Sequence, residues 1–217
     1  VVVASRRLDA ANSVAQSLPG SRSHRGAFVD VGDPESVEKL FALIKDTEPL
    51  PVSIVVNSAG VILHTPLVDT ADDDFDRIIR TNLKGTFLVN RASARAMAAS
   101  GVGDAVIVNV GSILGKVGGP LFGAYSAAKG GVMALTKTLA QELGPQGIRC
   151  NVVLPALTRT PMADSLSVEC QRVCTAKTLL GRMCEPEEVA QAILFLCSPQ
   201  SSYLTGSALE VTGVYSM

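Results

Sequence analysis

Short apolar runs rich in β-branched residues alternate with longer segments along the chain. Runs of this kind predict buried strands, here over residues 1–4, 24–31, 52–56, 105–110, 148–154 and 203–211. Between them, apolar residues recur at helical spacing, which predicts helices over residues 8–18, 35–45, 72–99 and 124–143 and a last helix ending near residue 197. This alternation indicates an α/β protein with a doubly wound parallel sheet between two helical layers.

The first predicted strand is unusual because it begins at residue 1. A buried parallel strand normally has neighbours on both sides. In Rossmann-like sheets that bind dinucleotides, an earlier strand and a glycine-rich turn hold the cofactor pyrophosphate at a helix N-terminus. This strand and turn are apparently absent from the numbered chain. Either the front end is missing or the protein has lost it, and we favour the first because the sheet would otherwise lack its central strand.

Composition narrows the class of protein. The 217 residues are 47% hydrophobic and 18% charged, which is typical of a globular protein, and we expect a single domain over 1–217. A net charge of −1 argues against a nucleic-acid partner. No apolar run reaches the ~18–20 residues of a membrane span. Residues 161–180 have weak patterning and are expected to form a mobile substrate lid within the domain.

The cysteines do not form an evident disulfide or metal pattern. There are 5 of them, an odd number without paired spacings, which indicates free thiols in a reducing compartment. Cys170 and Cys174 would share a helical face, but as metal ligands they would need partners. The histidines, His24 and His64, lie far away in sequence. We therefore expect no metal site.

Candidate chemistry concentrates in residues 112–129. Tyr125 and Lys129 lie four residues apart, so on a helix their side chains share one face. A phenol has an ordinary pKa of about 10, and a neighbouring ammonium would lower it. A tyrosine tuned in this way can give a proton to a carbonyl oxygen or take one from an alcohol. Ser112, at the end of a predicted strand, could hold the same substrate oxygen.

The alternative interpretation is that a Tyr-x-x-x-Lys pair on a helix is common and has no catalytic role. Three features favour the catalytic interpretation. Ser112 follows the carboxyl end of a strand, where open α/β sheets bind their ligands. Glycines crowd the segment between the serine and the tyrosine, so backbone can approach a ligand closely. Upstream, residues 57–60 (Asn-Ser-Ala-Gly) and 81–85 (Thr-Asn-Leu-Lys-Gly) fit the same pattern.

With these motifs the chain resembles the short-chain dehydrogenase/reductase superfamily over essentially all 217 residues. Within it, residues 82–89, 147–151 and 209–213 look most like the 17β-hydroxysteroid dehydrogenase type 8 subfamily, the α subunits of mitochondrial 3-oxoacyl-[acyl-carrier-protein] reductases. The resemblance implies an NAD(P)-dependent oxidoreductase that reduces a 3-oxoacyl thioester or oxidises a hydroxysteroid. The alternative is a non-catalytic partner subunit of a heterotetrameric reductase, which the resemblance to an α subunit and the missing front end suggest.

The resemblance also assigns roles to four catalytic residues. Tyr125 is expected to be the general acid/base, and Lys129 to lower its pKa and bind the nicotinamide ribose. Ser112 would hold the substrate oxygen. Asn82 would hold a water that links Lys129 to solvent, although a mid-helix asparagine can also be a tolerated residue of slightly low helix propensity.

Cofactor preference is suggested by the residues after the first predicted strand. Dinucleotide-binding folds often place an acid there to accept hydrogen bonds from the ribose 2′-hydroxyl. This chain has Ser5, and the neighbouring Arg6 could pair with a 2′-phosphate. The pattern favours NADP over NAD. The alternative is a pair of solvated surface arginines, Arg6 and Arg7.

Other cofactor contacts follow from the resemblance alone. Asp30 and Val31 would contact the adenine, although Asp30 could also cap the helix that starts near residue 34. Asn57, Ala59 and Gly60 would let the backbone pass close to the cofactor.

After the strand over 148–154, Pro155, Thr158 and Thr160 would contact the nicotinamide end, Thr158 (through its backbone) and Thr160 by holding its amide. The superfamily prefers glycine where this chain has Ala156, and alanine demands an ordinary backbone angle, so this loop could sit differently.

The expected partners are a small carbonyl or acyl-thioester substrate and further subunits. The resemblance implies a homo- or heterotetramer assembled through the helices over 72–99 and 124–143. It also implies the mitochondrial matrix or the cytoplasm as the location, and no targeting segment is visible in the numbered chain.

Overall fold

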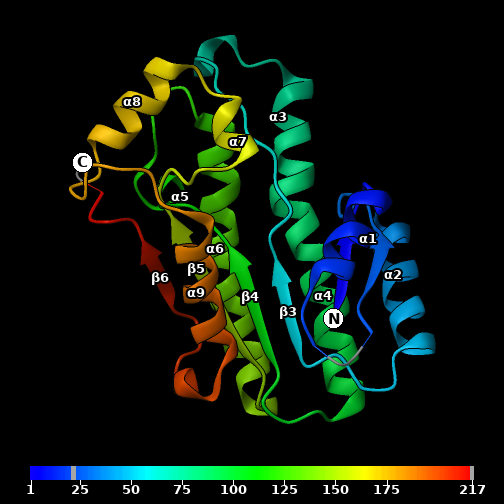
Figure 1. The fold of residues 1–217 in the computed structure, drawn as a ribbon. Coiled ribbons are helices and arrows are strands. Elements are labelled where there is room, and N and C mark those ends of the chain that lie inside the picture. Colours follow the sequence, from blue (N-terminus) through cyan, green and yellow to red (C-terminus); the bar gives the residue numbers. More distant parts are fainter. Residues whose placement is uncertain (21–22, 216–217) are drawn as a thin grey trace.

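The computed structural model describes residues 1–20 and 23–215 and contains a parallel sheet at its centre. Its four strands lie in the order β3–β4–β5–β6, with the bounds Ile54–Asn57, Val106–Val110, Arg149–Pro155 and Ala208–Val211. All three neighbouring pairs are parallel. In Figure 1 the strands point toward the end of the molecule where the short helices α7 (Pro161–Asp164) and α8 (Val168–Ala176) lie. The carboxyl ends of the strands therefore meet beneath these helices.

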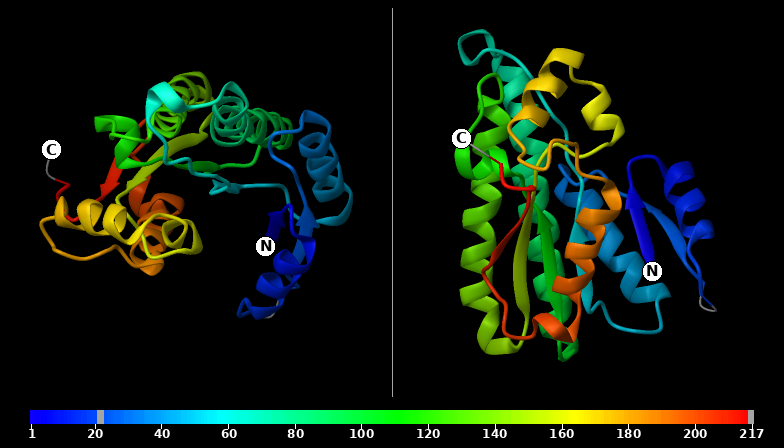
Figure 2. Two further views of the ribbon diagram at one scale, coloured as in Figure 1. Left: turned by 90° about the horizontal axis from the view of Figure 1, so that it is seen from above. Right: turned by 60° about the vertical axis from the view of Figure 1, so that its left-hand side comes forward.

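Helices cover both faces of this sheet. Helices α4 (Gly85–Ser100) and α6 (Gly123–Leu143) pack on one face, and α9 (Pro186–Cys197) packs on the other (Figure 2). The β4 side chains Val106, Ile107 and Val108 are completely buried between the two layers. This confirms the predicted αβα arrangement, because a strand buried on both faces has a nearly continuous run of apolar residues.

The first two strands form a separate sheet. Strands β1 (Val2–Ser5) and β2 (Arg25–Phe28) pair in parallel with each other, and among the described residues neither pairs with β3. The doubly wound parallel class is confirmed, but the described strands lie in two sheets and not in one. Ile54 and Val56 of β3 are 51% and 41% exposed, so packing leaves part of this apolar strand uncovered.

Helices α1 (Leu8–Ser17) and α2 (Pro34–Thr47) flank the smaller sheet. The cap of α2 corrects one expectation. Asp33, and not Asp30, is its N-cap, and the Asp33 carboxylate accepts a hydrogen bond from Glu35 N at 3.1 Å. The Pro34 ring suits the first helical position, so the sequence there has two signals for a helix start, the Asp33 cap and the proline after it.

The helix predicted over 72–99 is interrupted. Helix α3 (Asp72–Ile78) passes into a π-helical turn, Ile79–Lys84, before α4 begins. A π-helical turn holds more residues than an α-helical turn and occurs often at functional sites. Asn82 lies in this turn and is completely buried.

Several short elements were not predicted. Helix α5 (Ile113–Val117) follows directly after Ser112, whose hydroxyl accepts a hydrogen bond from Leu114 N at 3.2 Å and so caps the helix. Short 3₁₀ turns occur at Leu67–Asp69, Gly144–Gln146 and Pro199–Ser201. The segment predicted as a lid, 161–180, contains α7 and α8. Within the described residues, no helix combines the length and apolarity needed to cross a membrane.

Candidate active site

A cavity of about 510 Å³ lies at the carboxyl ends of the larger sheet. Seven of the predicted site residues line it: Gly60, Ser112, Tyr125, Lys129, Pro155, Thr158 and Thr160. They come from the loop after β3, the end of β4, helix α6, and the end of β5 with the loop that follows it. The fold thus brings together residues that are up to one hundred positions apart in sequence, as the predicted sheet topology requires.

Close packing of α5 on α6 sets the position of Ser112. Gly115 of α5 lies so close to α6 that an added Cβ atom would be 2.6 Å from the carbonyl carbon of Lys129 and 2.8 Å from Gly130 N. Only glycine permits this approach. The glycines between the serine and the tyrosine therefore have a structural role, which places Ser112 and Lys129 at a fixed separation.

Tyr125 is buried at the wall of the cavity. Burial raises the pKa of its phenol, and a hydrogen bond with the Ser112 side chain acts in the opposite direction. The Phe122 ring lies edge-on to the Tyr125 ring, with 6.5 Å between the ring centroids. At neutral pH the tyrosine is therefore protonated and has a proton to donate.

Lys129 is also buried, and burial lowers the pKa of its ammonium to about 8. Its Nζ donates a hydrogen bond to the carbonyl oxygen of Val110 at 2.7 Å and lies 5.7 Å from the centroid of the Tyr125 ring. We expected Lys129 to lower the pKa of Tyr125. That effect stays a prediction: here the ammonium is directed to the β4 backbone, and burial is the largest influence on the pKa of the phenol.

Asn82 holds the loop after β3 close to helix α6, which carries Tyr125 and Lys129. Its amide donates to Val61 O and accepts from Val61 N, both at 2.8 Å. A Cβ atom on Gly60 would lie 3.0 Å from Asn82 Oδ1 and 3.7 Å from Lys129 Nζ. Asn82 therefore ties its turn to the loop that contains Gly60, a residue of the cavity lining. The water that it is expected to hold stays a prediction.

The Asn57 side chain belongs to a buried amide network. Its Nδ2 donates to Asn90 Oδ1 at 2.6 Å and to Asn109 Oδ1 at 2.8 Å. Asn109 donates in turn to Thr136 Oγ1 at 2.9 Å, so the network joins β3, β4, α4 and α6. Sequence reasoning missed Asn90, Asn109 and Thr136. Polar residues inside predicted buried strands and helices were the signal, because a buried amide must find partners.

The predicted adenine-side residues lie after β2 and are tied to the π-helical turn. Asp30 Oδ2 accepts from Arg80 Nη2 at 2.9 Å, and Asp30 Oδ1 accepts from Gly32 N at 3.0 Å. Val31 packs against Gly85, where an added Cβ atom would be 2.7 Å from the valine side chain. Arg80 was not predicted. The adenine contact itself stays a prediction.

Ser5, Arg6 and Ala59 lie outside the cavity lining. The Ser5 hydroxyl accepts from Arg7 N at 3.2 Å and so shapes the turn after β1. Arg6 is exposed and forms no ion pair within the described part of the chain. Its guanidinium is therefore accessible to an anionic ligand, and its role stays a prediction.

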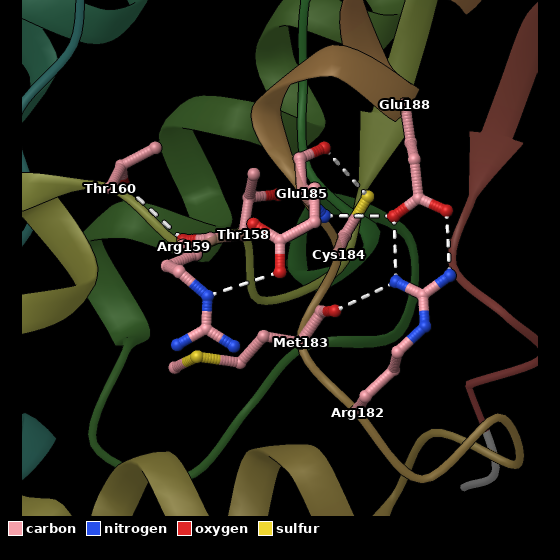
Figure 3. Close-up of polar contacts among 8 residues, drawn as sticks. All are labelled: Thr158, Arg159, Thr160, Arg182, Met183, Cys184, Glu185 and Glu188. Atoms are coloured by element: carbon pink, nitrogen blue, oxygen red, sulfur yellow. Dashed lines mark hydrogen bonds and ion pairs between the residues drawn. The ribbon is translucent and has the colours of Figure 1, made fainter.

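Thr158 and Thr160 lie in the loop after β5, and local hydrogen bonds fix their side chains. Thr158 Oγ1 donates to Ala156 O at 3.0 Å, and Thr160 Oγ1 donates to Thr158 O at 3.3 Å. Figure 3 shows the second of these bonds beside Arg159. Both threonines line the cavity together with Pro155.

The arrangement combines a protonated phenol, an ammonium and a hydroxyl at one wall of a largely apolar cavity. Such a set can donate a proton to a carbonyl oxygen and stabilise the charge that develops there. The small residues around Gly60, the ammonium of Lys129 and the loop threonines fit the nicotinamide end of a dinucleotide. No group of three or more metal-ligating side chains lies within the described residues.

The chain belongs to the short-chain dehydrogenase/reductase superfamily, a class of oxidoreductases defined by this fold and by the serine, tyrosine and lysine. Residues 1–216 match a family model described as enoyl-(acyl carrier protein) reductase. A solved short-chain type dehydrogenase/reductase from Mycobacterium marinum is 33% identical and superposes with a TM-score of 0.93, covering 99% of this chain and 85% of that one.

Two relatives show the range of named activities. A (3R)-3-hydroxyacyl-CoA dehydrogenase from Mus musculus is 41% identical over 201 residues, which cover 90% of this chain and 77% of the relative. A 3-oxoacyl-[acyl-carrier-protein] reductase from Thermotoga maritima is 34% identical over 233 residues, covering 94% of each. Both names describe chemistry between a 3-hydroxyacyl and a 3-oxoacyl group on a thioester carrier.

Proposed function

We propose that this protein is an NAD(P)-dependent oxidoreductase that reduces the 3-oxo group of an acyl thioester to a secondary alcohol. One observation carries the proposal. Ser112, Tyr125 and Lys129 lie together at the wall of a single cavity. The names of the two relatives support the thioester as the substrate class.

The chain's own residues supply the proton and the charge stabilisation. A bound nicotinamide dinucleotide would supply the hydride to the carbonyl carbon. As the carbonyl π electrons move to oxygen, Tyr125 transfers its phenolic proton to that oxygen, and the alcohol forms. Ser112 donates a hydrogen bond to the same oxygen, and Lys129 stabilises the phenolate that remains.

The raised pKa of Tyr125 supports the reductive direction. Burial raises the pKa of Tyr125, so the phenol carries its proton at neutral pH and can act as an acid. The opposite reaction, oxidation of an alcohol, needs the deprotonated phenolate as a base. Reduction at neutral pH thus uses the form of the tyrosine that burial stabilises.

The substrate side of the cavity suits an acyl chain. Its walls include the apolar side chains Ile62, Leu114, Phe122, Met162 and Leu166. The experiment is to incubate the complete polypeptide with NADPH and either a 3-oxoacyl-CoA or a ketosteroid, and to follow oxidation of the nicotinamide. Faster turnover of the thioester supports the proposal. Turnover of the steroid alone would move the substrate class to hydroxysteroids.

We further propose NADPH as the preferred cofactor because Arg6 is exposed and Ser5 replaces the acid that would bind a ribose hydroxyl. Arg6→Ala should weaken NADPH binding about tenfold or less and leave NADH binding unchanged, with Arg7→Ala as the matched control. Fluorescence titration measures both affinities. Tighter binding of NADH to the unmodified protein would contradict this preference. Binding of neither dinucleotide would favour a non-catalytic partner subunit.

We propose a tetramer built through the helices over 72–99 and 124–143. Phe75 of α3 and Phe87 of α4 are each 41% exposed, and partner subunits would cover them. Sedimentation of the complete polypeptide tests this assembly, and a monomer at micromolar concentration would contradict it.

A further inference from the structure

The two ends of the segment 161–180 are joined by a short backbone bridge. Thr158 and Cys184 form an isolated parallel β-bridge outside the named strands. Arg159 N donates to Cys184 O at 2.9 Å, and Cys184 N donates to Leu157 O at 3.0 Å. The chain thus enters and leaves α7 and α8 through two stems, residues 157–160 and 182–185, that lie side by side (Figure 3).

One ion pair joins the side chains of these stems. Arg159 Nε lies 3.1 Å from Glu185 Oε1, and the two side chains are 61% and 43% exposed. Their positions are 26 residues apart in sequence. In Figure 3 the Arg159 and Glu185 side chains point toward each other across the gap between the stems.

Glu185 is held in place by helix α9. It is the N-cap residue of α9, and its backbone N donates to Glu188 Oε2 at 2.8 Å. The Glu188 carboxylate also accepts from both terminal nitrogens of Arg182 at 2.7 Å. The Arg182 guanidinium lowers the pKa of Glu188 to about 2, so this arrangement stays charged through the ordinary pH range.

Arg159 is on the other side of this contact. It stands between Thr158 and Thr160, whose side chains line the cavity, while its own side chain reaches away to Glu185. A displacement of the Arg159 backbone also moves Thr158 and Thr160, because peptide bonds join them to it. The ion pair therefore connects the first turn of α9 to the part of the loop expected to hold the nicotinamide amide.

We propose that Arg159 and Glu185 are positioning residues, a clasp that holds Thr158 and Thr160 in place for the dinucleotide and fixes the base of the segment 161–180. The proposal rests on the proposed function, because it assigns the nicotinamide end of a dinucleotide to these threonines. It adds two exposed residues that do not touch the cavity and act on the cofactor through the loop.

The test compares dinucleotide affinity in charge variants of the complete polypeptide. Arg159→Ala and Glu185→Gln should each raise the Kd for NADPH about two- to fivefold, since an exposed ion pair has a modest effect. The KM for NADPH should rise with it, while kcat changes less. Exchanging the charges, Arg159→Glu with Glu185→Arg, should restore most of the affinity. Arg172→Ala is the matched control, because Arg172 pairs with Glu169 on α8 at 2.7 Å and is 69% exposed, close to the 61% of Arg159.

Measuring the Kd at high salt distinguishes the loss of the ion pair from a general loss of structure. At about 1 M salt an exposed pair is screened, so the unmodified protein and Arg159→Ala should converge in Kd. Unchanged affinity in both single variants, or a charge exchange that restores nothing, would overturn the proposal.

Hydrogen exchange in the free protein makes the test independent of cofactor binding. Arg159→Ala should speed exchange in residues 157–160 and 161–180, and Arg172→Ala should not speed it in residues 157–160. If the unmodified protein binds no dinucleotide, the proposed function fails while the exchange result still reports on the clasp. Unaltered exchange in Arg159→Ala would reject the clasp whatever the cofactor does.

Discussion

The catalytic wall and the stems of the segment 161–180 are held in place by different forces. Ser112, Tyr125 and Lys129 are 7%, 8% and 4% exposed, and glycine-to-backbone contacts set their spacing. The two stems are joined to each other by an exposed ion pair and a two-bond backbone bridge. Buried contacts fix groups that must meet a reacting atom, whereas exposed charge pairs are weak enough to open and reform.

The two regions also differ in the energetic cost of their charges. At the catalytic wall the chain buries an ammonium that water would solvate better, as the lowered pKa of Lys129 records. The stems keep their charges in water and so avoid this penalty. The catalytic wall therefore lowers the stability of the folded protein, whereas the stems of the segment 161–180 carry no such cost and can open and reform.

The largest expected effect comes from removing the proton donor at the buried wall. Tyr125→Phe deletes only the phenolic oxygen, so carbonyl reduction should fall about 10²–10⁴-fold while the fold is kept. Tyr203→Phe is the matched control, because Tyr203 is 102% exposed and does not line the cavity. Steady-state rates and circular dichroism of both variants make the comparison. Equal rates for Tyr125→Phe and the unmodified protein would show that this chain does not catalyse the reaction.

Removing the buried charge should raise stability while it lowers activity. The pKa of Lys129 is about 8 in the folded protein and 10.5 ordinarily, so between these values the unfolded chain binds more protons and stability rises with pH. From pH 7 to pH 10 the free energy of unfolding should rise by about 2–3 kcal/mol relative to Lys129→Met. Urea unfolding of both proteins at both pH values measures this difference. A constant difference would mean that Lys129 is not desolvated.

A smaller effect should follow from disturbing the glycine contact. Gly115→Ala would place a Cβ atom 2.6 Å from the backbone of α6, so the helices must shift, and we expect a loss of about 1–3 kcal/mol together with reduced turnover. Gly144→Ala is the control, because no atom lies within 4 Å of an added Cβ atom there. Chemical denaturation compares the two. Equal stability would show that α5 and α6 can move apart without consequence.

The sequence predicted the strands, most of the long helices and the placement of Ser112, Tyr125 and Lys129 at one site because these depend on local pattern. Apolar runs and a four-residue spacing are visible in one window of sequence. It did not predict the π-helical turn, where Asn82 makes a pair of hydrogen bonds with Val61, 21 residues earlier, that exist only in the folded chain. The Arg159–Glu185 contact was missed for the same reason, since its partners meet only after the fold has formed.

Arg80 and Asn82 lie in the same π-helical turn, which has 6 residues. Arg80 holds the loop after β2 through Asp30 and the Gly32 carbonyl, and Asn82 holds the loop after β3. Deleting one residue from this turn would rotate one anchor against the other by about 100°. A substitution in the turn disturbs the contacts of one residue, whereas a change in its length would disturb the anchors of both loops together.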